Sequence, residues 1–287
     1  MIYPANFDKL YIGPSGNPED APYKDGGQPA VLEWCTERGW DTMELAFVRQ
    51  VYLKEKDAEK VADKARELKF PLSAHGSYYI NLASLEPEKI EASRSRIVSG
   101  AKRIAQAGGH SIVYHSAFMT KRDSAEVTPI VIEQTKLVEK ELKDKDIKVW
   151  LRPELTGKES QHGDVAELIK VSNAVEMVLP CIDWSHLHAR YNGPYNSYEE
   201  WCEVLDKLER GIRNKNVLQR MHMHVSGIEY GPKGEKRHLP LATADLRYKE
   251  LMQALKQAGV CGTLVVEAPS VSVLEDVDRL RDAWESA

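Results

Sequence analysis

The sequence predicts an α/β protein, a single (β/α)8 TIM barrel that takes up residues 1–287 as one domain. Short apolar or β-rich runs alternate with longer amphipathic stretches, and eight such units fit a chain of this length. Strands that are separated by helices need crossover connections and therefore form a parallel sheet. An open, doubly wound sheet is the alternative. Its nucleotide-binding versions lose support because the chain has no GxGxxG after the first run and no GxxxxGKS/T.

Eight runs are expected to form the strands because each is short and apolar or β-rich, and helical patterns lie between them. In chain order these runs are residues 10–16, 42–48, 71–77, 111–117, 148–155, 177–184, 220–225 and 262–269. The predicted strands are therefore distributed along almost the whole sequence, from residue 10 to residue 269.

Amphipathic patterns between these runs predict the helices. The stretch 61–70 carries apolar residues at helical spacing, namely Val61, Ala62, Ala65 and Leu68. The stretch 92–109 ends on Gly108 and Gly109, which is a helix-stop signal. Similar patterns occupy residues 125–144, 164–173, 198–210, 243–259 and 271–284.

The composition is that of an ordinary globular protein. The chain has 42% hydrophobic residues, 44 acidic side chains and 39 basic side chains. The resulting net charge of -5 excludes a histone-like global attraction to nucleic acid. No stretch reaches the ~18 apolar residues of a membrane span, and the N-terminus lacks a secretion signal. Four cysteines lie far apart without a CxxC pair, which indicates reduced thiols. We therefore expect a cytoplasmic protein with no membrane partner.

Imidazole and carboxylate side chains recur at the ends of the predicted strands. They are His75, His115, Glu154, Asp183, His186, His224 and Glu267. In a barrel the C-terminal strand ends meet at one mouth, so these side chains are expected to converge. Each alone is more often a structural residue. Together they predict a site for Zn²⁺, with Mn²⁺ or Fe as other candidates, because these metals take nitrogen and oxygen ligands.

Two further segments bear on this site. His222 and His224 alternate with methionines, so both lie on one face of a strand, with His224 nearer the mouth as the expected ligand and His222 as a buried support. The segment 230–238 is expected to be a basic loop over the mouth, either an exposed turn or a loop that delivers His238.

These residues resemble the endonuclease IV family of apurinic/apyrimidinic endonucleases, within the xylose-isomerase-like barrels. The resemblance covers most of the chain and is weakest before residue 71. The matching segments are HGSYYINLAS (75–84), PELTGKESQHG (153–163), CIDWSHLHA (181–189), MHVSG (223–227) and VVEAP (265–269).

The resemblance implies three zinc ions. One is expected between His75, His115 and Glu154, and a second between Glu154, Asp183, His224 and Glu267, with Glu154 bridging them. The third is expected on His186 and His238 with an acidic residue two positions before the second histidine. Here that position is Lys236. Either Glu235 supplies the carboxylate through a shifted loop, which is the favoured expectation, or the third site is weak and often empty and the chain holds two ions.

The implied reaction is hydrolysis of the DNA phosphodiester 5′ to an abasic site, in base excision repair, with Glu154 and Glu267 as catalytic residues. The implied partner is double-stranded DNA with abasic lesions, bound by a monomer. Tyr78 and Tyr79 match the positions that enter the base stack, with loop packing as the alternative. The other expected substrate contacts are Asn81, Arg49, Gln50, Lys236 and Arg237.

Two other functions fit parts of the pattern. A sugar isomerase or epimerase of the same superfamily needs a single ion on Glu154, Asp183, His224 and Glu267, and the two glutamates then double as acid and base. A non-catalytic binder of damaged DNA is the third possibility, and retention of nearly every ligand argues against it.

Overall fold

Eight parallel strands form a closed barrel in the computed structural model, which describes residues 7–213 and 215–287. They are β1 (Leu10–Pro14), β2 (Met43–Ala46), β3 (Leu72–His75), β4 (Ser111–Tyr114), β6 (Trp150–Pro153), β8 (Cys181–Asp183), β9 (Met221–Val225) and β12 (Gly262–Val266). The ladders run β1-β12-β9-β8 and β2-β3-β4-β6. Single bridges between Ser15 and Glu44 and between Glu154 and Cys181 join the two ladders. The predicted TIM barrel is confirmed.

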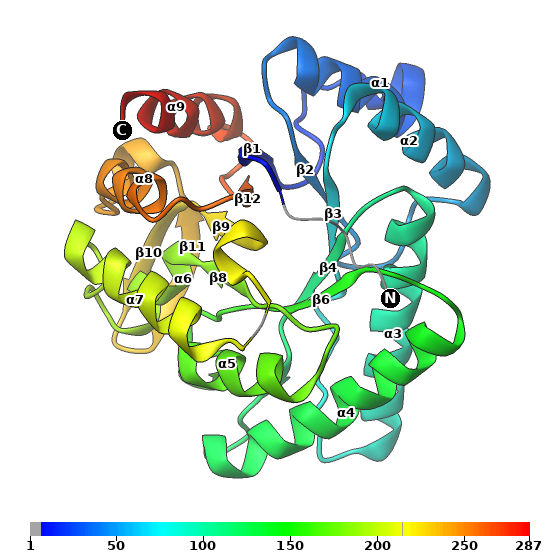
Figure 1. Ribbon diagram of the computed structural model, residues 1–287, viewed down its shortest axis with the longest axis vertical. Helices are drawn as coiled ribbons and strands as arrows, with labels where there is room; N and C mark the ends of the chain where they lie inside the picture. The colour runs from blue at the N-terminus through cyan, green and yellow to red at the C-terminus, as the bar shows by residue number, and fades with distance from the viewer. Residues whose placement is uncertain (1–6, 214) are drawn as a thin grey trace.

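Helices surround this barrel, as Figure 1 shows. The α-helices are α1 (Tyr23–Glu37), α2 (Glu55–Leu68), α3 (Pro87–Gln106), α4 (Ser124–Asp144), α5 (Val165–Ala174), α6 (Trp184–Arg190), α7 (Tyr198–Gly211), α8 (Tyr248–Gln257) and α9 (Val273–Ser286). Two short 3-10 turns, η1 (Val217–Gln219) and η2 (Leu241–Thr243), precede β9 and α8. Within the described ranges, no helix is both long and apolar enough to span a bilayer.

Two helices were not expected from the sequence. Helix α1 lies between the first two predicted strands, where no helical pattern was recognised, and Gly27, with a φ of 65°, kinks it just before Pro29. Glycine and proline disfavour a helix interior, so the local sequence conceals this helix. Helix α6 replaces the end of the predicted strand 177–184. There Asp183 ends β8 and accepts a hydrogen bond from the backbone N–H of His186 at 2.7 Å as the N-cap.

Strand alternation separates the core from the barrel interior. On β3, Leu72 and Ala74 belong to the apolar core, whereas Ser73 and His75 are buried polar residues. Strand β9 repeats the pattern with its methionines in the core and both histidines buried as polar residues. Because side chains alternate between the faces of a strand, the polar set shares the inward face. The apolar core thus lies between strands and helices, and the barrel interior is polar.

The segment 230–238, predicted as a loop, forms most of a β-hairpin. Strand β10 (Gly227–Gly231) pairs antiparallel with β11 (Gly234–Leu239). Gly234, with a φ of 84°, makes the tight turn between them. A second small hairpin pairs β5 (Ala117–Phe118) with β7 (Gln161–His162). Both hairpins follow the C-terminal ends of barrel strands and therefore stand at the mouth.

Candidate metal centre

Glu154 lies at the centre of the polar cluster at the mouth. Its Oε2 atom lies 3.0 Å from His75 Nε2 and 3.2 Å from His115 Nε2. Its Oε1 atom lies 3.1 Å from His186 Nδ1 and 3.5 Å from His224 Nδ1. The carboxylate is completely buried. One glutamate therefore stands between two groups of histidines that come from different strands.

The cluster contains three groups of potential ligands whose donor atoms lie within 4.8 Å of one another. These groups are His75, His115 and Glu154; Glu154, Asp183, His224 and Glu267; and His186, Glu235 and His238. They coincide with the three sets that the resemblance predicted, including Glu235 in the third. The structure thus brings together all nine residues that we expected near metal.

Several donor atoms in this cluster have no hydrogen-bond partner among the described residues. They include Glu154 Oε1, Asp183 Oδ2 and His224 Nδ1, which all belong to the second group. Buried carboxylates without partners are costly, and a divalent cation removes this cost. The donor set of imidazole nitrogens and carboxylate oxygens fits Zn²⁺, Mn²⁺ or Fe.

Charge in the cluster also favours cations. Burial lowers the pKa of His75, but the hydrogen bond and charge of Glu154 outweigh burial and raise that pKa to about 9. Burial raises the pKa of Glu154, but the charge of His115 and hydrogen bonds from the surrounding histidines hold it well below its usual range. The carboxylates therefore stabilise positive charge at the positions where ions would bind.

Backbone carbonyls orient three of the histidines. His75 Nδ1 donates to Gly76 O at 2.9 Å, His186 Nδ1 to Leu155 O at 3.0 Å, and His238 Nδ1 to Glu267 O at 2.7 Å. A carbonyl oxygen only accepts, so Nδ1 carries the proton in each ring. This leaves Nε2 as the nitrogen that would bind a metal, because a cation can replace the proton on Nε2 while Nδ1 keeps its hydrogen bond.

A β-bulge places Glu235 in the third group. Along the hairpin, Arg237 pairs with Glu229 but Glu235 pairs with Tyr230, so Lys236 is an extra residue on β11. The extra residue resets the alternation and brings Glu235 to the same face as His238. Glu235 Oε2 lies 3.6 Å from His186 Nε2. We predicted that a shifted loop would bring Glu235 to the third group, and the structure achieves this shift by a bulge within strand β11.

Gly157 makes room for this carboxylate. A Cβ atom at this position would lie 2.6 Å from Glu235 Cβ and 3.1 Å from His186 Cδ2. The backbone carbonyl of Gly157 also accepts a hydrogen bond from the Glu235 N–H at 2.9 Å. The segment after Glu154 therefore holds the hairpin against α6.

Glu44 on β2 is the buried acid that we did not single out from the sequence. Its Oε2 atom accepts hydrogen bonds at 2.9 Å from His222 Nε2 and from Ser73 Oγ. Its Oε1 atom lies 3.0 Å from His224 Nε2. A glutamate inside the apolar run 42–48 was the available signal. The carboxylate therefore contacts His224 at Nε2, whereas Nδ1 of the same ring faces Glu154 and Glu267 of the second ligand group.

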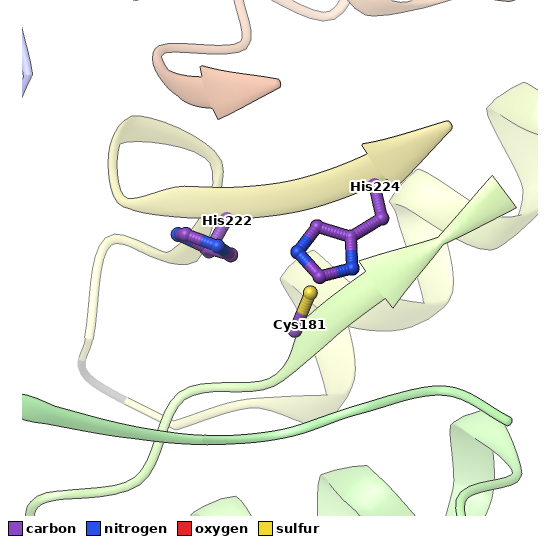
Figure 2. Close-up of side chains that lie close together, drawn as sticks. All are labelled: Cys181, His222 and His224. Atoms are coloured by element: carbon purple, nitrogen blue, oxygen red, sulfur yellow. The ribbon is translucent and has the colours of Figure 1, made fainter. Parts of the chain in front are cut away.

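His222 is a support beneath the site, as expected. Its Nε2 donates to Glu44, so its Nδ1 is the acceptor for Thr263 Oγ1 at 2.9 Å. Burial is the main cause that lowers the pKa of His222, to about 4, so the ring is neutral. Cys181 lies close to both His222 and His224 (Figure 2). Both nitrogens of His222 have partners, so His222 is not free to bind a metal in this trio.

The expected substrate contacts have different surroundings. Tyr78 and Tyr79 are 63% and 66% exposed at the mouth. The Asn81 side-chain oxygen accepts hydrogen bonds from the backbone N–H groups of Ala83 and Phe118, so it shapes two loops. Lys236 and Arg237 form ion pairs with Glu229, at 3.3 and 2.8 Å, and so do not point into the ligand cluster.

A family model described as a xylose isomerase-like TIM barrel matches residues 32–286. The chain belongs to this family. An uncharacterized protein of Methanocaldococcus jannaschii is 41% identical over 229 residues, which cover 79% of this chain and 81% of that protein.

Solved structures of similar fold include enzymes of more than one kind. Endonuclease IV from Thermus thermophilus is 19% identical with a TM-score of 0.71, covering 97% of this chain and 100% of that one. A D-tagatose 3-epimerase-like protein is 15% identical with a TM-score of 0.73, covering 97% of both chains. A 3-keto-D-glucoside 4-epimerase from E. coli is 16% identical with a TM-score of 0.70, covering 96% of this chain and 100% of that one. Identities this low show the fold alone.

Proposed function

We propose that this protein is a multi-zinc hydrolase that cleaves the DNA phosphodiester 5′ to an abasic site. The observation that carries the proposal is the set of three ligand groups at one mouth, two of which share Glu154. An enzyme with one ion needs only the second group. The other two groups would then be buried or half-buried ligand sets without a cation.

The chain's own residues suit this reaction. Bound zinc ions would supply hydroxide near neutral pH and neutralise charge on the reacting phosphate. Glu154 and the oriented histidines would bind these ions. The exposed Tyr78 and Tyr79 come three and four residues after His75, where they can stack on the bases that flank a lesion. Double-stranded DNA with abasic lesions is the proposed partner.

The second group by itself favours another candidate. Glu154, Asp183, His224 and Glu267 form a complete four-residue site, and a sugar epimerase could use the two glutamates as acid and base. Elemental analysis of the purified protein separates the two proposals. We expect two or three zinc ions per chain and nicking of an abasic duplex that leaves a 3′-hydroxyl. One ion per chain, with turnover of a keto sugar and no nicking, would replace the hydrolase by the epimerase.

Replacing Tyr78 and Tyr79 by alanine should weaken binding to an abasic duplex by about 1–3 kcal/mol for each ring, because stacking on bases is lost. Both rings are exposed, so the midpoint of thermal unfolding should change little. Leu137→Ala is the control, since this exposed residue lies on α4 within the outer layer of helices. Normal DNA binding combined with early unfolding would assign the tyrosines to loop packing.

Glu44→Gln should lower zinc affinity by about 10–100-fold, measured by chelator competition, because the partner of His224 loses its charge. In the wild type, His222 and His224 both face a carboxylate oxygen of Glu44, which is an acceptor. In the variant, one of them would face the amide N–H group, which is a donor. Ser73→Ala is the matched control, since it removes one hydrogen bond to the same carboxylate and leaves the negative charge of Glu44 in place. Equal affinities in Glu44→Gln and the wild type would show that Glu44 does not support the ligand.

A further inference from the structure

We infer that a cavity beside the metal centre is a binding subsite for a phosphate oxyanion of the substrate. The cavity has a volume of about 340 Å³. It lies between the segment after β2, the segment after β3 and the face of α3. The polar residues of its wall are Arg49, Gln50, Ser77, Ser95, Arg96 and Ser99. The family resemblance counts Arg49 and Gln50 among the expected substrate contacts, but it assigns no ligand to Ser77, Ser95, Arg96 or Ser99 and no phosphate to the cavity.

The charges in this wall are not balanced. It contains two guanidinium groups, and none of the lining residues is acidic. Arg49 has no hydrogen bond or ion pair to any residue that the structure describes. Arg96 has one long hydrogen bond, 3.5 Å from its Nη1 to Tyr79 O, and lies 5.8 Å from the centre of the Tyr79 ring. Two unneutralised arginines facing one cavity favour an oxyanion, because the guanidinium fork matches its geometry.

Neutral donors complete the wall. Ser95 and Ser99 are four residues apart on α3, so they share one face of the helix with Arg96 beside them. Ser77 Oγ accepts a hydrogen bond from the Tyr79 N–H at 3.2 Å, which leaves its own proton free to donate. Serine hydroxyls together with arginines are typical of sites that bind phosphate.

The cavity adjoins the metal centre through the backbone. Gly76 and Ser77 of its wall follow His75, whose Nε2 lies 3.0 Å from Glu154. The segments are tied together, because Phe47 N donates to His75 O and Tyr78 N donates to Val48 O, both at 2.9 Å. A ligand can therefore place one phosphate here while another part of it lies at the mouth.

Two sources of this oxyanion share the same chemistry. One is a backbone phosphate of DNA next to the cleaved bond, and the other is the phosphate of a small sugar phosphate. Whether the oxyanion is a DNA phosphate or a sugar phosphate depends on the proposed function. The presence of an oxyanion subsite does not depend on it.

The test is a double variant, Arg49→Ala with Arg96→Ala, in the metal-loaded protein. The control is Arg210→Ala with Arg279→Ala, which removes the same charge from α7 and α9, where each arginine already faces an acid. Affinity for an abasic duplex is measured against salt concentration. Binding of ribose 5-phosphate is measured by equilibrium dialysis, with ribose as the unphosphorylated comparison.

If the subsite holds a backbone phosphate, the double variant binds the duplex about tenfold more weakly than the control variant, and its salt slope is shallower by about 1. If it holds a sugar phosphate, ribose 5-phosphate binding falls instead while ribose is unaffected. Equal binding of both ligands by the double and control variants would overturn the subsite, whether or not the protein cuts DNA. If the double variant loses ribose 5-phosphate binding and the wild-type protein does not nick DNA, the subsite is supported and the proposed nuclease function is wrong.

Discussion

We expect the substitution Glu154→Gln to abolish phosphodiester cleavage. The carboxylate stands between two ligand groups, and the amide removes the negative charge that both would share. Metal ions supply several kcal/mol of transition-state stabilisation, so turnover should fall by at least about 10³-fold. The zinc content should fall as well. Cleavage of an abasic duplex and elemental analysis measure the two effects.

Glu159→Gln is the matched control for this variant. The same chemical change is made in the same segment, at an exposed residue outside the three ligand groups. This control should keep both activity and metal. Near-complete metal-dependent cleavage by Glu154→Gln would contradict the bridging assignment. Circular dichroism checks that the barrel remains folded, since the amide leaves the volume of the side chain unchanged.

His238→Ala and Glu235→Gln should each lower the metal content by about one ion per chain and slow phosphodiester cleavage. Each change removes one of the three ligands of the third group, and the two that remain are fewer than the three or four protein ligands of a zinc site. The first two groups do not include these residues, so the remaining ions should stay. Elemental analysis of both variants measures the loss.

Deleting Lys236 should leave the metal content unchanged. The bulge absorbs this one residue, and without it Glu235 and His238 would be two positions apart on a regular strand, which again places them on one face. That spacing is the acidic residue-x-histidine pattern of the endonuclease IV family. Loss of an ion on deletion would show that the bulge itself shapes the site. Unchanged metal in His238→Ala and Glu235→Gln would show that the hairpin carries no zinc.

The three ligand groups could be predicted largely because of a simple geometric rule. His75, Asp183 and Glu267 stand at or just after strand ends that are recognisable from apolar runs. In a closed parallel barrel those ends meet, so positions along the sequence translate directly into a common place. Alternation along β9 likewise separated the two histidines from the methionines of the core. The fold and the convergence of ligands were therefore determined by the sequence alone.

Other features depend on contacts between distant residues. The partners of Glu44 come from Ser73 on β3 and His222 on β9, which no local pattern connects. The bulge at Lys236 is set by pairing with β10, and Gly157 is needed where the hairpin approaches it. The cavity between Arg49 and Arg96 exists only because the segment after β2 packs beside α3. Local sequence determined which side chains could bind metal, and tertiary packing decided their orientation, because hydrogen bonds and close approach act between strands rather than along them.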